Sequence, residues 1–573
     1  MKTIKIITLT SITALILSFT SCDDFLTPYN PVGQTEDMLY QTEDGFEAGV
    51  NGAYSYIRKL WGLKQGVYLM EAGTDLWTTG SEPQSETLLH YIELGSGENY
   101  VRDNLWANSY FAIYQCNTML QYLEYAKPAT RTNREAEMRV LRSYFWWVLT
   151  ENFENIHFST EPNAGNTKGI KGTPEQVYEQ IFKDLEFAIT GNNLPNTSTD
   201  LGRITKPVAE ALLARICLTR GKNTEAITYA KNVINNYGYE LETLDRLWNP
   251  NLQRSNKEVI WAVNRHENAT LNGGVETLNG VFSPRFTTLT KTGLLFGFSS
   301  TTDPIAGDGN VQSGRLMPTY RLLSLFDQDN DARFKATFKS AWKANTNTDG
   351  LSAIVIRSIY PRWTAADAAE YGNASLANEY RFGMGDTSLL LIFNNDNIKR
   401  FPKVPYNTLD QNDFYDAETK APIERRAYFQ LMKHFDSQVK NTSSTRDFFM
   451  IRLSEMYLII AEADFKVNGS NAAEGLKYLN DLRKKRATTN ADAAFTNVTS
   501  IPNIDFILDE RARELCGEQL RWLDLKRTGK LVEYVRNYNP DATGIKDFHI
   551  RRPYPQTQLD QMSNPEIFVQ EGY

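Results

Sequence analysis

The feature that most constrains the fold of this chain is a pair of amphipathic helical patterns joined by one glycine. The stretch TKPVAEALLARICLTRGKNTEAITYAKNVINNYGYEL begins at Thr205, and its regular apolar spacing breaks at Gly221. The residues that share one helical face are Ala209, Leu212, Leu213 and Ile216 before the glycine, and Ala226, Ala230 and Val233 after it. With small residues where the helices would cross, this stretch predicts two antiparallel helices packed on each other.

A second pattern of the same kind lies near the C-terminus. In RLSEMYLIIAEADFKVNGSNAAEGLKYLNDLRKKR, one apolar face precedes Gly469 and another follows it. The two faces contain Leu453, Met456, Tyr457 and Ile460, then Ala473, Leu476 and Leu479. Each pair is typical of a tetratricopeptide-like unit. The intervals keep no strict period, so we expect a mainly α protein with a few helix pairs and not a long solenoid.

Two short signals predict where helices begin. Thr132 and Glu135 in TNRE are spaced as a capping box, in which each side chain bonds a free amide of the first turn. Thr173 and Gln176 in TPEQ are spaced as a second capping box. Pro174 occupies the first helical position, where the backbone amide hydrogen has no partner within the helix, so its absence costs nothing.

Between the two helical blocks, from about Asn264 to Arg446, the amino-acid composition and the apolar pattern of the sequence change. Gly, Asn, Thr and Ser become frequent, and the apolar runs are short, such as AIVI and SLLLIF. We expect long loops with a few short strands. Loops of such length are usually functional or disordered, and the aromatic content of this one favours an ordered, functional segment. Its aromatic residues include Phe282, Phe286, Tyr320, Tyr360 and Trp363.

The N-terminus has the pattern of an export signal. Lys2 and Lys5 precede a mostly apolar run from residue 6 to 19, which is too short for a stable membrane span. Two small residues and then Cys22 follow, as in bacterial lipoproteins, in which the thiol is acylated. We predict a signal peptide of residues 1–21 and lipidation of Cys22, with secretion and a free thiol as the alternative. No second apolar run of spanning length follows, so we expect a soluble body that is held to the bilayer only by its lipidated end.

Charge and cysteine content exclude several classes of protein. The net charge is −8, the pI is about 5.5, and no block of Lys and Arg is present, so no nucleic acid partner is expected. Beyond Cys22, the three cysteines are Cys116, Cys217 and Cys516, each far from the others and within an apolar helical pattern. This spacing predicts buried single thiols and not a disulfide framework or a zinc site.

The catalytic and metal-binding motifs that we sought are absent from the sequence. The chain has 5 histidines, and none forms HExxH; no Walker sequence and no GxSxG elbow is present. The stretch DQDND, Asp327 to Asp331, begins like a calcium loop, but Ala332 and Phe338 stand where that loop needs Gly and Glu. A polar helix end is the interpretation we favour. We expect a protein that is not an enzyme and has no cofactor, and we leave a structural calcium ion open.

Several longer segments carry a family resemblance. They are CDDFL, AEMRVLRSYFWWVL, GRITKPVAEALLARICLTRG, RLSEMYLIIAEADF, LNDLRKKR, DERARELCGEQLRWLDLKRTG and RPYPQTQLDQ. In this order and spacing they resemble the SusD/RagB family of outer-membrane nutrient-binding lipoproteins of Bacteroidetes. The resemblance covers essentially the whole mature chain and is weakest between residues 264 and 446.

The resemblance implies a single compact SusD-like body with tetratricopeptide-like helix pairs, long loops and a few short strands. Residues 22–263 would form an N-terminal region, and residues 264–573 a C-terminal region with ligand-binding loops at 264–446. Family members cap a SusC-type TonB-dependent transporter, pass oligosaccharides into it and have no catalysis of their own. Asp23 and Asp24 resemble the export signal of surface lipoproteins, which implies a body that faces the cell exterior.

Sugar rings lie on aromatic faces, while their hydroxyl groups bond planar polar side chains. In GTDLWTTGSE, Asp75 and Trp77 are therefore candidate ligand contacts, because a Trp in a Gly- and Thr-rich loop has little local core to join. Core packing is the alternative for Trp77. Weaker candidates are Arg285 and Phe286 in SPRF and Tyr360 and Trp363 in YPRW.

Three other functions remain open from the sequence. The same architecture could capture peptides or other non-sugar nutrients in a groove that bonds backbone amides. A secreted glycoside hydrolase is a second alternative, because 69 acidic residues always offer some pair at a suitable separation. A scaffold whose helix pairs bind only protein is the third.

Overall fold

The computed structural model describes residues 36–162, 165–200, 202–272, 278–285, 313–343, 387–393, 407–436 and 444–573. Cys22, Phe286, Tyr360 and Trp363 lie outside these residues. Our predictions for these four side chains therefore stay predictions.

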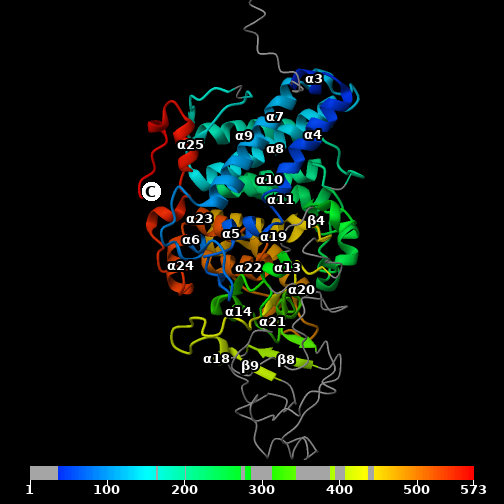
Figure 1. Cartoon of the computed structure of the whole chain (residues 1–573). Helices are drawn as coiled ribbons and strands as arrows, with labels where there is room; N and C mark the ends of the chain where they lie inside the picture. Colours follow the sequence, from blue (N-terminus) through cyan, green and yellow to red (C-terminus); the bar gives the residue numbers. More distant parts are fainter. Residues whose placement is uncertain are drawn as a thin grey trace, which may run out of the picture.

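An array of antiparallel helices forms most of the molecule (Figure 1). Its members are α4 (Glu43–Arg58), α7 (Asn108–Gln121), α8 (Arg131–Phe153), α9 (Pro174–Ile189), α10 (Lys206–Thr219), α11 (Asn223–Asn236), α19 (Leu453–Asn468) and α20 (Ala473–Arg486). Each helix packs on the next in this order. Both predicted helix pairs, α10 with α11 and α19 with α20, are confirmed, as is the mainly α fold. The contact of α11 with α19 joins the two pairs across the middle of the sequence.

Shorter elements connect and cover the array. The other α-helices are α3 (Glu36–Tyr40), α5 (Lys64–Met70), α6 (Glu86–His90), α12 (Leu244–Leu247), α13 (Leu278–Val281), α14 (Tyr320–Ser324), α15 (Arg333–Thr337), α18 (Gln411–Phe414), α21 (Ala493–Thr496), α22 (Ile504–Leu515), α23 (Arg521–Arg527), α24 (Leu531–Tyr538) and α25 (Gln556–Gln561). A π-helix, η1, covers Tyr100–Ala107; the 3₁₀ turns are η2 (Leu123–Tyr125), η3 (Pro250–Ser255), η4 (Ala269–Asn272), η9 (Gly469–Asn471), η10 (Asp547–Ile550) and η11 (Pro565–Ile567).

The two predicted helix starts have different outcomes. At α9, the Thr173 hydroxyl accepts from the Gln176 amide and the Gln176 side chain bonds the Thr173 amide, so this capping box is confirmed. The box at Thr132 and Glu135 is wrong, because α8 already begins at Arg131 after Thr130. The Thr130 amide bonds the carbonyl of Lys127, a turn that starts the helix earlier than the side-chain signal suggested.

The middle segment leaves the helical array and returns to it through two paired strands. Strand β4 (Val259–Val263) runs antiparallel to β11 (Phe448–Arg452), with Val263 opposite Phe448. Both ends of the segment between them are thus held at one place on the array. Strand β11 continues directly into α19, which places the return point beside the second helix pair.

The remaining strands form small separate sheets. Strands β1 (Trp77–Thr79) and β5 (Leu316–Pro318), β2 (Ile156–His157) and β3 (Lys171–Gly172), and β6 (Phe338–Lys339) and β10 (Gln430–Leu431) form antiparallel pairs. In the three-stranded sheet, β8 (Thr387–Ile392) is central, antiparallel to β7 (Ala341–Lys343) and parallel to β9 (Asn407–Asp410). Figure 1 shows β8 and β9 at the end of the molecule opposite α3 and α4.

A cluster of buried ion pairs, here called the buried junction, links the turn before β4 with β11, α15, α20 and α22. It consists of Glu258, Arg333, Arg452, Arg486 and Glu514, none more than 2% exposed at the side chain. Arg452 and Arg486 each bond a Glu258 oxygen at 2.6 Å, and both also bond Glu514. Burial opposes ionisation of Glu514, but the charges of the three arginines hold its pKa well below its usual range.

The three cysteines within the described residues are buried and unbridged, as predicted. Burial raises the pKa of Cys116 and Cys217 to about 12 and that of Cys516 to about 11, so the three thiols stay protonated and unreactive. None of the helices in the described part of the chain combines the length and the hydrophobicity of a membrane span.

Candidate functional site

The loop that follows α5 is held rigidly in the core. The Asp75 carboxylate accepts two hydrogen bonds from Arg521, at 2.8 and 2.7 Å, and both side chains are buried. The Trp77 ring has no exposed surface and lies 4.5 Å from the ring of Phe282. The Asn539 amide donates to the carbonyls of Thr74 and Trp77, at 2.6 and 3.3 Å. These contacts make the loop a fixed base.

Asp75 and Trp77 present no surface to a ligand in this structure. In the structure the Trp77 ring is packed in the core, which is the alternative given for it above. The local sequence could not reveal the partner of its ring, because Phe282 comes from the distant middle segment. Asp75 is likewise committed to Arg521 on α23, and its carboxylate neutralises a buried guanidinium that would otherwise be unpaired.

The short ladder of β1 and β5 brings the early loop beside the middle segment. Beyond Thr79 the ladder continues irregularly: the Gly80 amide bonds the carbonyl of Arg315 at 3.0 Å, and the Glu82 amide bonds that of Gly314 at 2.8 Å. Gly314 has φ +63°, and a Cβ there would lie 2.4 Å from the Ser81 hydroxyl oxygen. Only glycine fits this close approach without strain.

On top of this base lies a partly exposed polar edge, here called the binding edge, made of Ser81, Glu82, Arg285 and Arg315. Glu82 and Arg285 form an ion pair at 2.6 Å, with side chains 49% and 41% exposed. Arg315 donates to the carbonyl of Glu82 at 2.8 Å. Three of the ligand contacts predicted from the sequence, Asp75, Trp77 and Arg285, lie within the described residues, and of these only Arg285 is at the surface. The structure brings it next to the loop of residues 73–82.

A second ion pair that the sequence did not single out adjoins strand β1. Arg425 bonds both carboxylate oxygens of Asp541 at 2.7 Å and the carbonyl of Thr79 at 2.6 Å. The Thr78 hydroxyl also donates to Asp541, at 2.5 Å. Partial burial opposes ionisation of Asp541, but the bonds from Arg425 and Thr78 lower its pKa. Since these residues lie in three distant parts of the chain, no local motif could have indicated them.

The side chains of the binding edge are of the kind that bond hydroxyl groups. Guanidinium groups donate up to five hydrogen bonds in a plane, and carboxylates accept, which together suit the donor and acceptor pattern of sugar hydroxyls. Glu82 is paired with Arg285 and has no second carboxylate in the defined edge. The described part of the edge thus contains polar groups of the kind that bond sugar hydroxyls, and the aromatic candidates Tyr360 and Trp363 lie outside the described residues.

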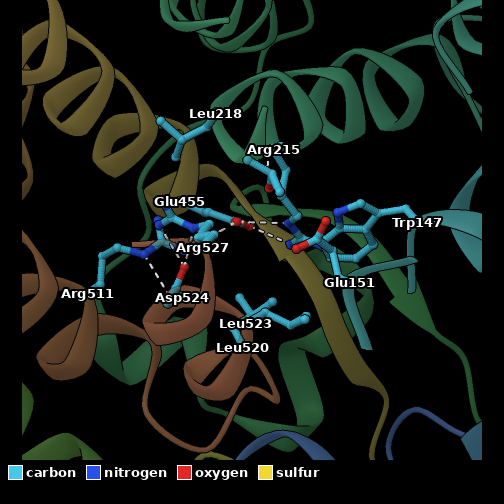
Figure 2. A pocket seen from close by; sticks show the side chains of 11 residues that line it. Trp147, Glu151, Arg215, Leu218, Glu455, Arg511, Leu520, Leu523, Asp524 and Arg527 are labelled. Atoms are coloured by element: carbon cyan, nitrogen blue, oxygen red, sulfur yellow. Dashed lines mark hydrogen bonds and ion pairs between the residues drawn. The ribbon is translucent and has the colours of Figure 1, made fainter. Parts of the chain in front are cut away.

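An enclosed pocket among α8, α10, α19, α22 and α23 is too small for a ligand (Figure 2). Its volume is about 10 Å³, the space of a single water molecule. Charged side chains in its wall bond one another: Arg215 lies 2.6 Å from Glu455, and Arg511 lies 2.8 Å from Asp524 (Figure 2). This pocket is part of the polar packing between helices.

No group of three or more His, Cys, Asp or Glu side chains among the described residues could hold a metal ion. In the DQDND turn, Asp331 is buried and bonds Arg333 at 2.8 Å, while Asp327 bonds Asn330 at 2.8 Å within the turn. These contacts give the two aspartates a structural role at the helix end.

Comparisons with known proteins agree with this architecture. Residues 257–568 match the family model described as "SusD family", and residues 71–218 match one described as "Starch-binding associating with outer membrane". The first match covers more than half of the chain, so the protein belongs to the SusD family.

Individual relatives match along nearly the whole length. "SusD-like protein P25" of Formosa agariphila is 21% identical over 571 residues, 95% of each chain, and "SusD-like protein P2" of the same organism is 23% identical over 577 residues, 96% of each.

Solved structures share the fold. A "Laminarin binding SusD-like protein" superposes with a TM-score of 0.63 at 22% identity, covering 91% of this chain and 98% of that one. "Surface glycan-binding protein A from Bacteroides thetaiotaomicron in complex with laminarihexaose" has a TM-score of 0.61 at 19% identity, covering 93% of this chain and 100% of the other.

Proposed function

We propose that this protein is a cell-surface lipoprotein that captures oligosaccharides and polysaccharides at the binding edge and delivers them to a SusC-type TonB-dependent transporter. The observation that carries the proposal is the match of family models and relatives along nearly the whole chain. The proposal also includes the lipid anchor at Cys22, attachment to the outer membrane and a body that faces the cell exterior.

Capture in this proposal depends on a rigid base and an exposed rim. The buried pair of Asp75 and Arg521 and the packed rings of Trp77 and Phe282 keep β1 in place. Glu82 and Arg285 on the rim then need little reordering to bond a sugar, which limits the entropy lost on binding. The named ligands of the structural neighbours make β-glucans the first compounds to test.

The decisive experiment is a calorimetric titration of the mature chain with laminarin and laminarihexaose. We expect Arg285→Ala to raise Kd by about tenfold or more, the usual loss for a hydrogen bond from a charged group. Arg536→Ala is the matched control, because Arg536 is also an exposed arginine paired with an acid, Asp547, at 3.1 Å. Equal affinities of the two variants for a bound glycan would remove Arg285 from the site.

The same titration separates the alternative functions. If laminarihexaose is shortened during incubation, the protein is a glycoside hydrolase and not a pure binding protein. If starch, xylan and galactomannan also fail to bind while a mixture of peptides binds, the peptide-capture alternative holds.

Localisation and partnership require cells. We expect Cys22→Ala to release the protein from the outer membrane, and we expect the unaltered protein to be cut by protease added to intact cells. We also expect a transporter of the SusC type to co-purify with it from detergent-solubilised outer membranes. Full protection from protease would contradict the exterior orientation.

A further inference from the structure

A second concave site lies on the helical array, away from the binding edge. Helix α7, residues 157–161 and 165–169, and helix α25 line a groove of about 480 Å³. Small-molecule sites in proteins have volumes of about 300–1,000 Å³. The groove shares no lining residue with the binding edge. In Figure 1, α7 and α25 lie toward the end that carries α3, whereas α13 and α14 lie toward the other end. We call this site the α7 groove.

Aromatic rings form one wall of the α7 groove. Tyr110 and Tyr114 stand four residues apart on the same face of α7, which is a rise of about 6 Å. This rise is close to the length of one sugar unit. Phe111 also lines the groove and is 58% exposed, which makes it a large apolar side chain with little part in the core.

Both tyrosine rings are fixed through their hydroxyl groups. Tyr110 donates to the carbonyl of His157 at 3.1 Å, and Tyr114 donates to Glu36 of α3 at 2.6 Å. A ring held in this way loses little freedom when a ligand stacks on it, so the wall is prepared for binding.

Two other lining residues, His157 and Gln558, supply neutral hydrogen-bond donors. His157 accepts the amide hydrogen of Ile170 at its Nδ1, at 2.9 Å, so the neutral ring carries its proton on Nε2. Burial lowers the pKa of His157, which keeps the ring neutral at physiological pH. Gln558 accepts from the Trp106 indole at 3.2 Å through its amide oxygen, so its orientation is fixed with two N–H groups left to donate.

We propose that the α7 groove is a second glycan-binding site, in which sugar faces stack on Tyr110, Phe111 and Tyr114 and sugar hydroxyls bond His157 and Gln558. The proposal rests on the proposed function, since it takes the ligand to be a glycan. A lipid would leave the polar groups of His157 and Gln558 unpaired. The charged groups in the lining, Glu161 and Lys168, are of opposite sign, so the groove does not favour an anion such as phosphate.

Two sites on one chain would change how the protein holds a polymer. A polysaccharide that reaches both sites binds the second one at high effective concentration, so its apparent affinity exceeds that of a short oligosaccharide. Laminarihexaose occupying one site at a time gains nothing from the second. The ratio of the two affinities therefore reports on the groove.

The test uses the mature chain in native gels that contain laminarin, starch, xylan or galactomannan, followed by titration with the polysaccharide that retards it most. We expect Phe111→Ala and Gln558→Ala each to raise Kd for that polysaccharide by about three- to tenfold, the range for loss of one stacking or hydrogen-bonding contact. Val467→Ala on α19 is the control, because Val467 is 54% exposed and lies outside the groove. Thermal melts of all variants verify that they are folded.

The outcomes distinguish the two proposals. Weaker binding by the groove variants, together with residual binding by Arg285→Ala that is lost when Phe111→Ala is added, supports two sites. If the groove variants bind like Val467→Ala while Arg285→Ala is impaired, the groove proposal fails and the proposed function stands. If the unaltered chain binds none of the four polysaccharides, both proposals fail for these ligands.

Discussion

The buried junction and the binding edge use the same side chains for opposite purposes. In the junction, Arg452 and Arg486 share Glu258 and Glu514, and every partner is shielded from water. At the edge, Glu82 and Arg285 form one pair that is almost half exposed. Charges removed from water must be fully paired, and breaking such a set is strongly destabilising. An exposed pair adds little to stability and stays available to a ligand.

Acidification should destabilise the fold through four buried glutamates that pair with arginine or lysine, one of which, Glu514, belongs to the junction. Burial opposes ionisation of Glu462, Glu510, Glu514 and Glu518, yet the surrounding arginines and lysines lower the pKa of each below the ordinary 4.5. Their stabilisation is present above pH 4.5 and is lost as the pH falls toward the lowered pKa values. Because the losses from the four groups add, we expect the protein to unfold as the pH falls below 4.5, which circular dichroism measures.

Removal of one carboxylate from the junction should have the next largest effect. Glu514→Ala leaves Arg333, Arg452 and Arg486 short of a partner inside the core. We expect the free energy of unfolding, measured by urea denaturation, to fall by about 3–5 kcal/mol. A loss below 1 kcal/mol would show that water reaches the junction and would remove the contrast with the edge.

Replacement of the buried Glu71 should increase the free energy of unfolding, whereas replacement of Glu514 should decrease it. Burial raises the pKa of Glu71 to about 7. Hydrogen bonds from backbone amides near Leu520 favour the ionised form, but they do not outweigh the effect of burial. Its ionisation therefore opposes folding progressively from pH 4.5 to 7. We expect Glu71→Gln to raise the free energy of unfolding by roughly 2–3 kcal/mol at pH 8 and by far less at pH 5. The same gain at both pH values would contradict a raised pKa.

The smallest effect is expected at the edge itself. Glu82→Gln should change the free energy of unfolding by less than about 1 kcal/mol, as is usual for exposed ion pairs. Urea denaturation of Glu82→Gln and Glu514→Ala under the same conditions compares the contribution of the edge to stability directly with that of the junction. A loss as large as that of Glu514→Ala would mean that the edge is a structural element and not a surface for ligands.

The sequence predicted those parts of the fold that depend on local patterns. The helix pairs around Gly221 and Gly469 and the cap at Thr173 each need only neighbouring residues, and all three are confirmed. Apolar spacing also predicted the buried thiols correctly. The family resemblance, carried by whole motifs, extended these local predictions to the complete body.

The candidate site was harder to predict because it is assembled from distant segments. Trp77 stands in a polar loop, and nothing near it in the sequence shows that Phe282 covers its ring. The pair of Arg425 with Asp541 and the pair of Glu82 with Arg285 likewise join residues far apart in the chain. A pairing of this kind follows from strand register, such as that of β1 with β5, which a single sequence without strong alternation does not define.

The pairing of β4 with β11 has a consequence for how the ligand face can diversify. These strands and the contact of α11 with α19 close the helical array at the two ends of the segment from 264 to 446. Parts of this segment also join the core, because they supply Arg333 to the buried junction and β5 to the pairing with β1. Loop-closure entropy grows only slowly with length, by about 0.6 kcal/mol for each doubling. Insertions and deletions in those parts of the segment that join neither the buried junction nor the pairing of β1 with β5 therefore carry little thermodynamic cost, so these parts can vary while the scaffold stays the same.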